Sequence, residues 1–176
     1  EKDLPSDELL DMAWELREIT QDKALLFVNG RVDIALAVGA DGVHLPEEGL
    51  SVAAVRTVAE NQLIIGRSVH SVRMAQCAED EGVDFVLVGT ILKTVSKKGV
   101  LGMGLELVRK VACAVQIPVL GIGGINAENA QQVVKAGASG IAVIGAIMDA
   151  EHTGKATRVL QRAVEVAGSS KIQAMR

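Results

Sequence analysis

The sequence predicts an α/β fold of repeated βα units, and the uniform length of its six units favours a closed barrel over an open, doubly wound sheet. Short, nearly continuous apolar runs alternate with amphipathic helical segments, a pattern typical of parallel strands covered on both faces. Small or polar residues follow most of the apolar runs, and a glycine ends most of the helical segments. The predicted strands are residues 24–29, 42–45, 63–69, 85–89, 119–124 and 141–144.

The helical segments between these runs have recognisable starts. Ser6, Ser51 and Ser71 are the predicted N-caps of the helices that follow them, because a serine hydroxyl can accept a hydrogen bond from the first free amides. Six strands fall short of the eight in a (β/α)8 barrel, and the chain opens on a helix rather than a strand. The predicted helices are residues 7–20, 32–38, 52–59, 72–81, 105–114 and 127–136.

One turn sequence recurs three times along the chain. Residues 38–43, 81–86 and 136–141 each place a glycine where a helix is expected to end and a strand to begin. Glycine can adopt the left-handed conformation that closes a helix at this position. The repeat therefore supports successive βα units of the same design.

Length and composition narrow the classes of function. The chain has 176 residues and a net charge of −4, and 2% of its residues are aromatic, with no tyrosine. Such a chain is not expected to bind nucleic acid or an anionic membrane. The longest uncharged stretch, residues 111–127, is broken by Pro118 and several glycines, so it predicts a helix end and a strand rather than a membrane span. We expect a single cytoplasmic domain over residues 1–176, with a C-terminal helix and tail at 151–176.

The most specific strand end is Gly66-Arg67-Ser68-Val69-His70-Ser71. Side chains alternate along a strand, so Gly66, Ser68 and His70 are expected on one face, where two small residues leave space below a histidine. Imidazole titrates near neutral pH, which makes His70 the predicted catalytic acid and base. The alternative is that His70 caps the next helix or fills the rim of the fold.

Two glycine-rich strand ends predict a phosphate site. Consecutive glycines in Gly121-Ile122-Gly123-Gly124-Ile125-Asn126 let backbone N–H groups close on an anion. Ile144-Gly145-Ala146 ends the next strand, and barrels commonly hold phosphate between the loops of their last two strands. Tight turns without a ligand are the alternative. The long connection 90–104 is either a lid, whose Lys97 and Lys98 meet a phosphate or carboxylate, or a solvated loop.

The first two predicted strands end in Asn29-Gly30-Arg31 and Leu45-Pro46-Glu47-Glu48-Gly49. Glu47 and Glu48 are candidate metal ligands, but carboxylates without a fixed second partner are usually solvated, so we expect no metal site. His44 precedes this turn and is predicted to pack within its strand.

Together these motifs resemble the thiamine phosphate synthase/TenI superfamily, whose fold is a (β/α)8 TIM barrel of thiamine biosynthesis. The resemblance covers nearly the whole chain, from Glu1 to Ala150. It implies that the first βα unit and most of the second strand are missing, because Glu1-Lys2 matches the tail of a Gln-x-Arg-x-Lys motif that ends that strand. The matching stretches are residues 29–36, 40–45, 66–71, 94–98 and 121–125.

The superfamily has two main branches. The synthase branch joins a pyrimidine diphosphate to a thiazole phosphate and requires magnesium, and the resemblance places its two metal-binding aspartates at Gly30 and Gly49. Glycine offers no carboxylate, so a hard cation loses both anchors. The TenI branch resembles the chain better, through Asn29-Gly30-Arg31 and Gly66–Ser71. It includes a thiazole tautomerase, an isomerase that aromatises a carboxythiazole phosphate without metal and uses the motif's histidine, here His70, to move the proton.

We therefore predict a TenI-type thiazole tautomerase that uses no cofactor and binds a small thiazole phosphate; a homo-oligomer is left open. One alternative is a thiamine phosphate synthase, for which Mg²⁺ is expected. Another is a noncatalytic protein that binds thiazole or thiamine phosphate. The predicted substrate- and phosphate-binding residues are Ser68, Lys97, Gly123, Gly124, Ile144 and Gly145, with Lys2, Asn29 and Arg67 as further candidates.

Overall fold

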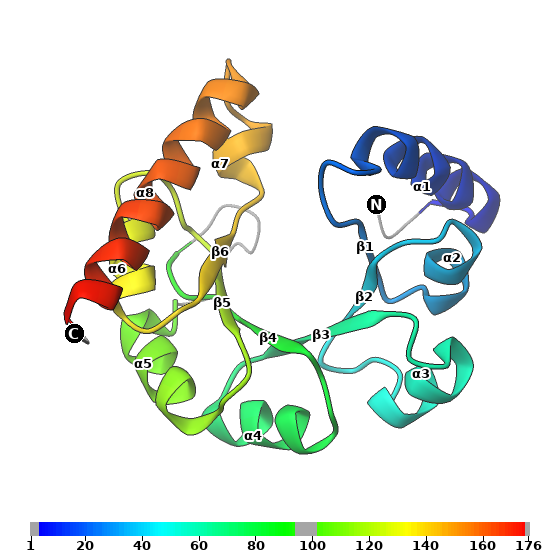
Figure 1. The fold of residues 1–176 in the computed structure, drawn as a ribbon, viewed down its shortest axis with the longest axis horizontal. Helices are drawn as coiled ribbons and strands as arrows, with labels where there is room; N and C mark the ends of the chain where they lie inside the picture. Colours follow the sequence, from blue (N-terminus) through cyan, green and yellow to red (C-terminus); the bar gives the residue numbers. More distant parts are fainter. Residues whose placement is uncertain (1–3, 94–101, 175–176) are drawn as a thin grey trace. The chain divides into compact units, whose positions relative to one another are not determined.

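The structure is a computed structural model that describes residues 4–93 and 102–174 (Figure 1). The chain divides into two compact units. The first unit contains Glu1–Ser68 and Glu81–Asp84, and the second contains Val69–Asp80 and Phe85–Arg176. Lys2 and Lys97 lie outside the described residues.

The part of the first unit that the structure describes is a three-stranded parallel sheet with three helices. In chain order its elements are α1 (Ser6–Thr20), β1 (Phe27–Asn29), α2 (Val32–Ala37), β2 (Gly42–Leu45), α3 (Val52–Ala59) and β3 (Ile64–Val69). The strand β2 lies between β1 and β3, and the register pairs Asn29 with His44 and His44 with Gly66. The carboxyl ends of the three strands therefore meet at one edge of the sheet.

The two faces of this sheet differ in their side chains. Val43 and Leu45 of β2 are completely buried, whereas Gly42 and His44 point to the opposite face because side chains alternate along a strand. On that opposite face, Phe27 covers Gly42 so closely that a Cβ on Gly42 would overlap the phenyl ring. Apolar residues thus fill this face toward the start of the strands, and polar residues lie toward their ends.

Within its described residues, the second unit is a three-stranded parallel sheet with five helices. Its elements are α4 (Val72–Asp80), β4 (Phe85–Val88), α5 (Gly104–Ala114), β5 (Val119–Ile122), α6 (Ala130–Lys135), β6 (Gly140–Ala142), α7 (Gly145–Met148) and α8 (Thr153–Ala174). The strand β5 lies between β4 and β6. Leu160, Ala163 and Ala167 form the buried stripe of α8, which packs against α6.

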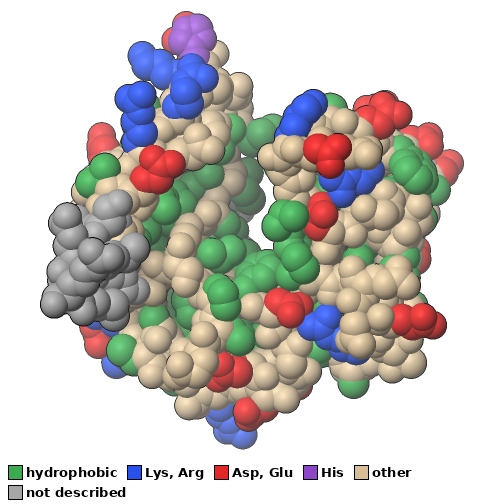
Figure 2. All heavy atoms as spheres, in the orientation of Figure 1, with side chains coloured by type: hydrophobic (Ala, Val, Ile, Leu, Met, Phe, Trp, Pro, Cys, Tyr) green, Lys and Arg blue, Asp and Glu red, His purple; other side chains and the backbone are tan. Residues whose placement is uncertain are grey.

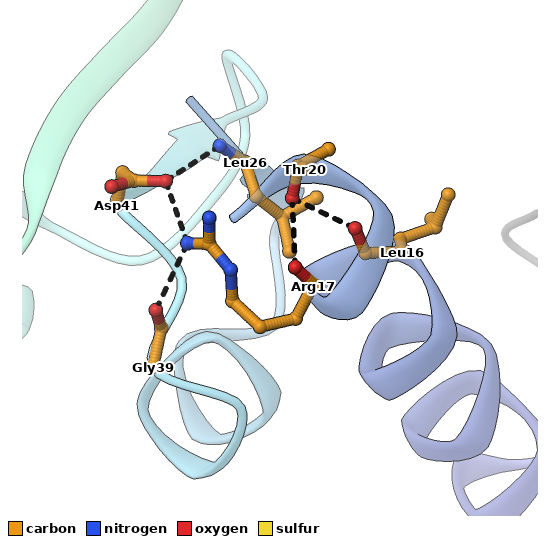
Figure 3. A network of polar contacts seen from close by, with 6 residues as sticks. All are labelled: Leu16, Arg17, Thr20, Leu26, Gly39 and Asp41. Carbon is orange, nitrogen blue, oxygen red and sulfur yellow. Dashed lines mark hydrogen bonds and ion pairs between the residues drawn. The ribbon is translucent and has the colours of Figure 1, made fainter. Parts of the chain in front are cut away.

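Two aspartates in the first unit hold helix-to-strand turns in the same way, and we call each arrangement a carboxylate clamp. Asp41 Oδ2 accepts hydrogen bonds from Leu26 N at 2.7 Å and from Arg17 Nη1 at 2.8 Å (Figure 3). Arg17 Nη1 also donates to the carbonyl of Gly39 at 3.2 Å. One carboxylate thereby connects α1, the start of β1 and the turn before β2.

The second clamp repeats this pattern around Asp84. Its Oδ2 accepts from Ile65 N at 2.6 Å and from Arg56 Nη2 at 2.8 Å, and Arg56 Nη2 also donates to Gly82 O at 3.0 Å. The turn glycines Gly39 and Gly82 have φ of +62° and +84°, as the recurring turn sequence predicts. The third copy of the turn has Ser139 in place of aspartate and keeps only the backbone bond, from Ser139 N to Val119 O at 2.7 Å.

The predicted α/β class with six parallel strands is confirmed, and most predicted elements are shorter by one to three residues at their ends. The closed (β/α)8 barrel stays a prediction. Ser51 and Ser71 act as predicted, since their hydroxyls accept from Ala54 N and Met74 N at 3.2 Å each. The N-cap role of Ser6 is wrong: Ser6 is the first residue of α1, and its Oγ accepts from Arg31 Nη1 at 3.1 Å. Among the described helices, none combines the length and the hydrophobicity that crossing a membrane demands.

The clamps predict how two conservative substitutions affect stability. We expect Asp41→Asn and Asp84→Asn each to lower the free energy of unfolding by about 1–2 kcal/mol, because each replaces a charge-assisted acceptor of a strand amide and an arginine. Urea denaturation measures this loss. Asp80→Asn, on the exposed side of α4, is the matched control, and an equal effect from all three substitutions would contradict a role for the clamps.

The Asp41 clamp also predicts a pH dependence. The hydrogen bond from Leu26 N, and then the bond from Arg17, hold the pKa of the Asp41 carboxyl below its usual range. This stabilisation is fully present above the unfolded-state pKa and is lost as the pH falls through the folded-state pKa. The stability gap between wild type and Asp41→Asn should therefore narrow in acid, as measured by urea denaturation at a series of pH values.

Candidate functional site

Three polar side chains form a row at the carboxyl edge of the first unit's sheet. Asn29 ends β1, His44 pairs with it on β2, and Ser68 lies two residues beyond His44's partner on β3. All three alternate with buried residues of their own strands, so they share the face that the helices do not cover. The structure therefore places the predicted site residues Asn29 and Ser68 in one row and adds His44 between them.

His44 and Ser68 are in direct contact. The distance between His44 Nε2 and Ser68 Oγ is 2.8 Å, which is a hydrogen bond. Burial lowers the pKa of the His44 imidazole, because a half-buried ring is less well solvated when charged. At neutral pH the ring is therefore uncharged, and the whole row bears donors and acceptors without net charge.

Arg67 occupies the other face of β3. Its Nη1 forms an ion pair with Glu81 at 2.8 Å, and its Nη2 donates to Glu47 O at 3.0 Å. The guanidinium thus links the turn after β2 to the turn after α4. These contacts give Arg67 a structural role, and its predicted contact with substrate stays a prediction.

His70 lies in the short connection between β3 and α4 and belongs to the second unit. It is half-buried, and the cap of α4 is the neighbouring Ser71, whose hydroxyl accepts from Met74 N. The hydroxyl of Ser71 therefore caps this helix, as predicted. Its role in catalysis stays a prediction.

The glycine turn after β5 is held in one conformation by asparagines. Gly123 and Gly124 have φ of +103° and +66°, so only glycine suits this backbone well. Asn129 Nδ2 donates to Gly124 O at 3.0 Å, and Asn129 Oδ1 accepts from Asn126 N at 2.9 Å. In return, Asn126 Oδ1 accepts from Asn129 N at 3.2 Å.

The chain after β4 packs directly on this glycine turn. Ile91 N donates to Ile122 O at 2.9 Å, and Leu92 N donates to Gly123 O at 3.0 Å. A Cβ on Gly124 would stand 2.5 Å from Lys93 O, which leaves no room for a side chain. Both described ends of the long connection are anchored here, because Met103 N donates to Thr90 O at 2.9 Å.

The end of β6 is less favourable to an anion than the turn after β5. Ile144 precedes α7, which begins at Gly145 and has only four residues. The Asp149 carboxylate lies against Gly145, since a Cβ there would stand 2.6 Å from Asp149 Oδ2. This negative charge opposes a phosphate at Gly145.

Basic side chains lie beside the same loops of the second unit. Figure 2 shows Lys and Arg side chains near a histidine at the α7–α8 end, and a groove of about 390 Å³ in this region is lined by Asn126, Ala146, His152 and Lys155 among others. Lys155 offers a positive charge close to the β5–α6 loop. This charge favours an anion in the second unit.

Gly30 and Gly49 stand at the two positions where the family resemblance places metal-binding aspartates. A Cβ on Gly30 would lie 3.9 Å from Pro46 Cδ, and one on Gly49 would lie 3.0 Å from the same atom, so the two positions are neighbours. Neither bears a carboxylate. Within residues 4–93 and 102–174, no three His, Cys, Asp or Glu side chains are grouped so that they could hold a metal ion.

Two groups of site residues were not predicted from the sequence. His44 was expected only to pack in its strand, and its contact with Ser68 depends on the register of β2 and β3. The asparagines of the β5–α6 loop had a visible signal, because Asn126 and Asn129 have the spacing of reciprocal side-chain caps.

Comparisons with known proteins match this chain along most of its length. The family model described as thiamine monophosphate synthase matches residues 1–147. The thiamine-phosphate synthase of Pyrococcus furiosus is 45% identical over 93% of this chain and 79% of its own length, and that of Moorella thermoacetica is 43% identical with the same coverage. A solved structure titled thiamine phosphate pyrophosphorylase from Pyrococcus furiosus superimposes with a TM-score of 0.88 at 43% identity, covering 95% of this chain and 81% of that chain.

These relatives overturn the predicted activity. The expected thiazole tautomerase, an isomerase, is wrong, because the curated relatives that match most of the chain are named thiamine-phosphate synthases. The resemblance to the TenI branch rests on two short motifs, Asn29-Gly30-Arg31 and Gly66–Ser71, whereas the match to the Pyrococcus furiosus synthase extends over 93% of this chain. Acid–base catalysis by His70, inferred from the strand end at residues 66–71 and from the tautomerase, stays a prediction.

The superfamily inferred from the motifs is confirmed at the same time. The parallel βα units, the glycine turn after β5 and the match of residues 1–147 to the family model agree. The chain belongs to the thiamine monophosphate synthase (TMP-TENI) family.

Proposed function

We propose that this protein is a thiamine-phosphate synthase, which joins a pyrimidine diphosphate to a thiazole phosphate. The observation that carries the proposal is the 45% identity to the Pyrococcus furiosus synthase over 93% of the chain. The reaction forms a bond between the thiazole nitrogen and the carbon that bears the diphosphate, and diphosphate leaves with the bonding electrons. The proposal includes a cytoplasmic location and the closed (β/α)8 barrel that the family resemblance implies.

In this proposal the thiazole phosphate binds at the glycine turn of the second unit. Hydrogen bonds of Asn126 and Asn129 already order the backbone of this turn. The N–H groups of Gly123 and Gly124 can therefore bind a phosphate with little further loss of conformational entropy. The helix that follows has only six residues, so the backbone groups rather than the helix dipole supply most of the attraction. Lys155 adds positive charge, and Ile144 and Gly145 provide a second, weaker edge beside Asp149.

The pyrimidine diphosphate is assigned to the first unit. Asn29 and Ser68 present polar atoms on the open face of the sheet, where no charged side chain of the row competes with them. His70 is assigned to contact with substrate rather than to proton transfer, because the coupling reaction relocates no ring proton.

Glycine at positions 30 and 49 favours one other function. A protein that lacks both carboxylates at the positions expected to hold magnesium could bind thiazole or thiamine phosphate without joining the precursors. The glycine turn after β5 would serve such a binding protein equally well. One assay with and without metal distinguishes the two functions.

The assay combines the purified protein with both precursors, in MgCl₂ or in EDTA, and measures thiamine phosphate and diphosphate by chromatography. We expect equal amounts of the two products in MgCl₂, and the Pyrococcus furiosus synthase serves as the positive control. Saturable binding of thiamine phosphate with no product in either condition would reject the synthase and support the binding protein.

The glycine turn predicts a loss of phosphate affinity on substitution. Gly124→Ala forces a side chain onto Lys93 O and into a left-handed backbone, so we expect the affinity for thiazole phosphate, measured by calorimetry, to fall by about tenfold or more. Gly82→Ala is the matched control, because Gly82 also has a positive φ but has open space around it. It should lower stability by about 1 kcal/mol and leave the affinity unchanged. Equal affinities of the two variants would argue against a phosphate site at Gly124.

A further inference from the structure

The contact between His44 and Ser68 has a geometry that depends on Gly66. The register sets Gly66 directly beside His44 on the neighbouring strand, and Ser68 lies two residues further toward the carboxyl edge. Two residues of a strand span about 6.6 Å. The His44 imidazole can reach Ser68 over this distance only if its side chain passes over residue 66. Glycine at 66 leaves that position without a side chain, and the 2.8 Å bond to Ser68 Oγ results.

This bond restricts the Ser68 hydroxyl, which would otherwise rotate freely. A serine hydroxyl has one donor and two acceptor sites, and its proton turns to suit its partners. With Nε2 in place at 2.8 Å, one of these sites is occupied and the others point away from the ring. Asn29, which pairs with His44 on the neighbouring strand β1, places a side-chain amide at the same carboxyl edge of the sheet.

We propose that His44 is a positioning residue: it fixes the Ser68 hydroxyl so that this hydroxyl can bind a ring nitrogen or amino group of the pyrimidine substrate. This inference rests on the proposed function and deepens it. The Asn29–His44–Ser68 row offers donors and acceptors without net charge, which suits a heteroaromatic ring better than a phosphate. The burial that keeps the His44 ring neutral also keeps a competing positive charge away from the row.

A double-mutant cycle tests the inference. The variants are Ser68→Ala, His44→Leu and the double variant, with His44→Gln as the conservative replacement, because a glutamine amide can still reach the hydroxyl. Gln62→Leu is the control, at an exposed position just before β3 in the first unit. Michaelis constants for each precursor and thermal unfolding are measured for all of them.

We expect Ser68→Ala and His44→Leu each to raise KM for the pyrimidine diphosphate about tenfold, the loss of one oriented hydrogen bond, with KM for the thiazole phosphate unchanged. The double variant should be no worse than either single variant, because His44 acts through Ser68. His44→Gln should recover most of the affinity. Effects that multiply to about a hundredfold, or a normal KM in His44→Leu, would overturn the inference.

A second measurement separates failure of this inference from failure of the proposed function. If wild-type protein makes no thiamine phosphate, the proposed function fails, and the same variants are compared by calorimetry with thiamine phosphate as the probe. Non-additive losses of affinity would then still support positioning by His44. Additive losses, or no loss in any variant, would overturn it. The imidazole ¹⁵N shifts of His44 should also change in Ser68→Ala without any ligand, and identical shifts would contradict the bond itself.

Discussion

The structure of the first unit depends on a carboxylate that binds an amide near the start of a neighbouring strand and an arginine of the helix before that strand. Asp41 does this for Leu26 and Arg17, and Asp84 does it for Ile65 and Arg56. Each contact fixes where a strand begins relative to its neighbour. Because a shift of one residue would exchange the two faces of a strand, these contacts at the amino ends also determine which side chains meet at the carboxyl ends. The row from Asn29 to Ser68 is a consequence of them.

Much of this arrangement follows from local signals in the sequence. Buried parallel strands are continuously apolar. Ser51 marks the start of a helix through its hydroxyl, and the turn glycines mark helix ends through their left-handed backbone, so these elements could be predicted. Contacts between strands could not. The motif at residues 66–71 predicts a role for His70, whereas in the structure Gly66 and Ser68 lie beside His44, which is more than twenty residues earlier in the chain. Only the register brings that histidine to them.

The activity was harder to predict than the fold, for a related reason. Two short motifs suggested the TenI branch, and the glycines at 30 and 49 supported it, since they remove carboxylates expected in a synthase. The similarity of the rest of the chain points to the synthases instead. Individual positions tune a site on a shared scaffold, so a few of them can differ while the larger relationship persists. The two glycines remain a real departure, and Pro46 lies between them.

The reciprocal bonds of Asn126 and Asn129 have a thermodynamic consequence for any ligand of the β5–α6 loop. A loop that is already ordered loses little conformational entropy when a ligand binds, because that entropy is lost when the protein folds. A ligand should therefore bind this loop without a change in its backbone conformation. The binding enthalpy should then reflect the new contacts between ligand and protein.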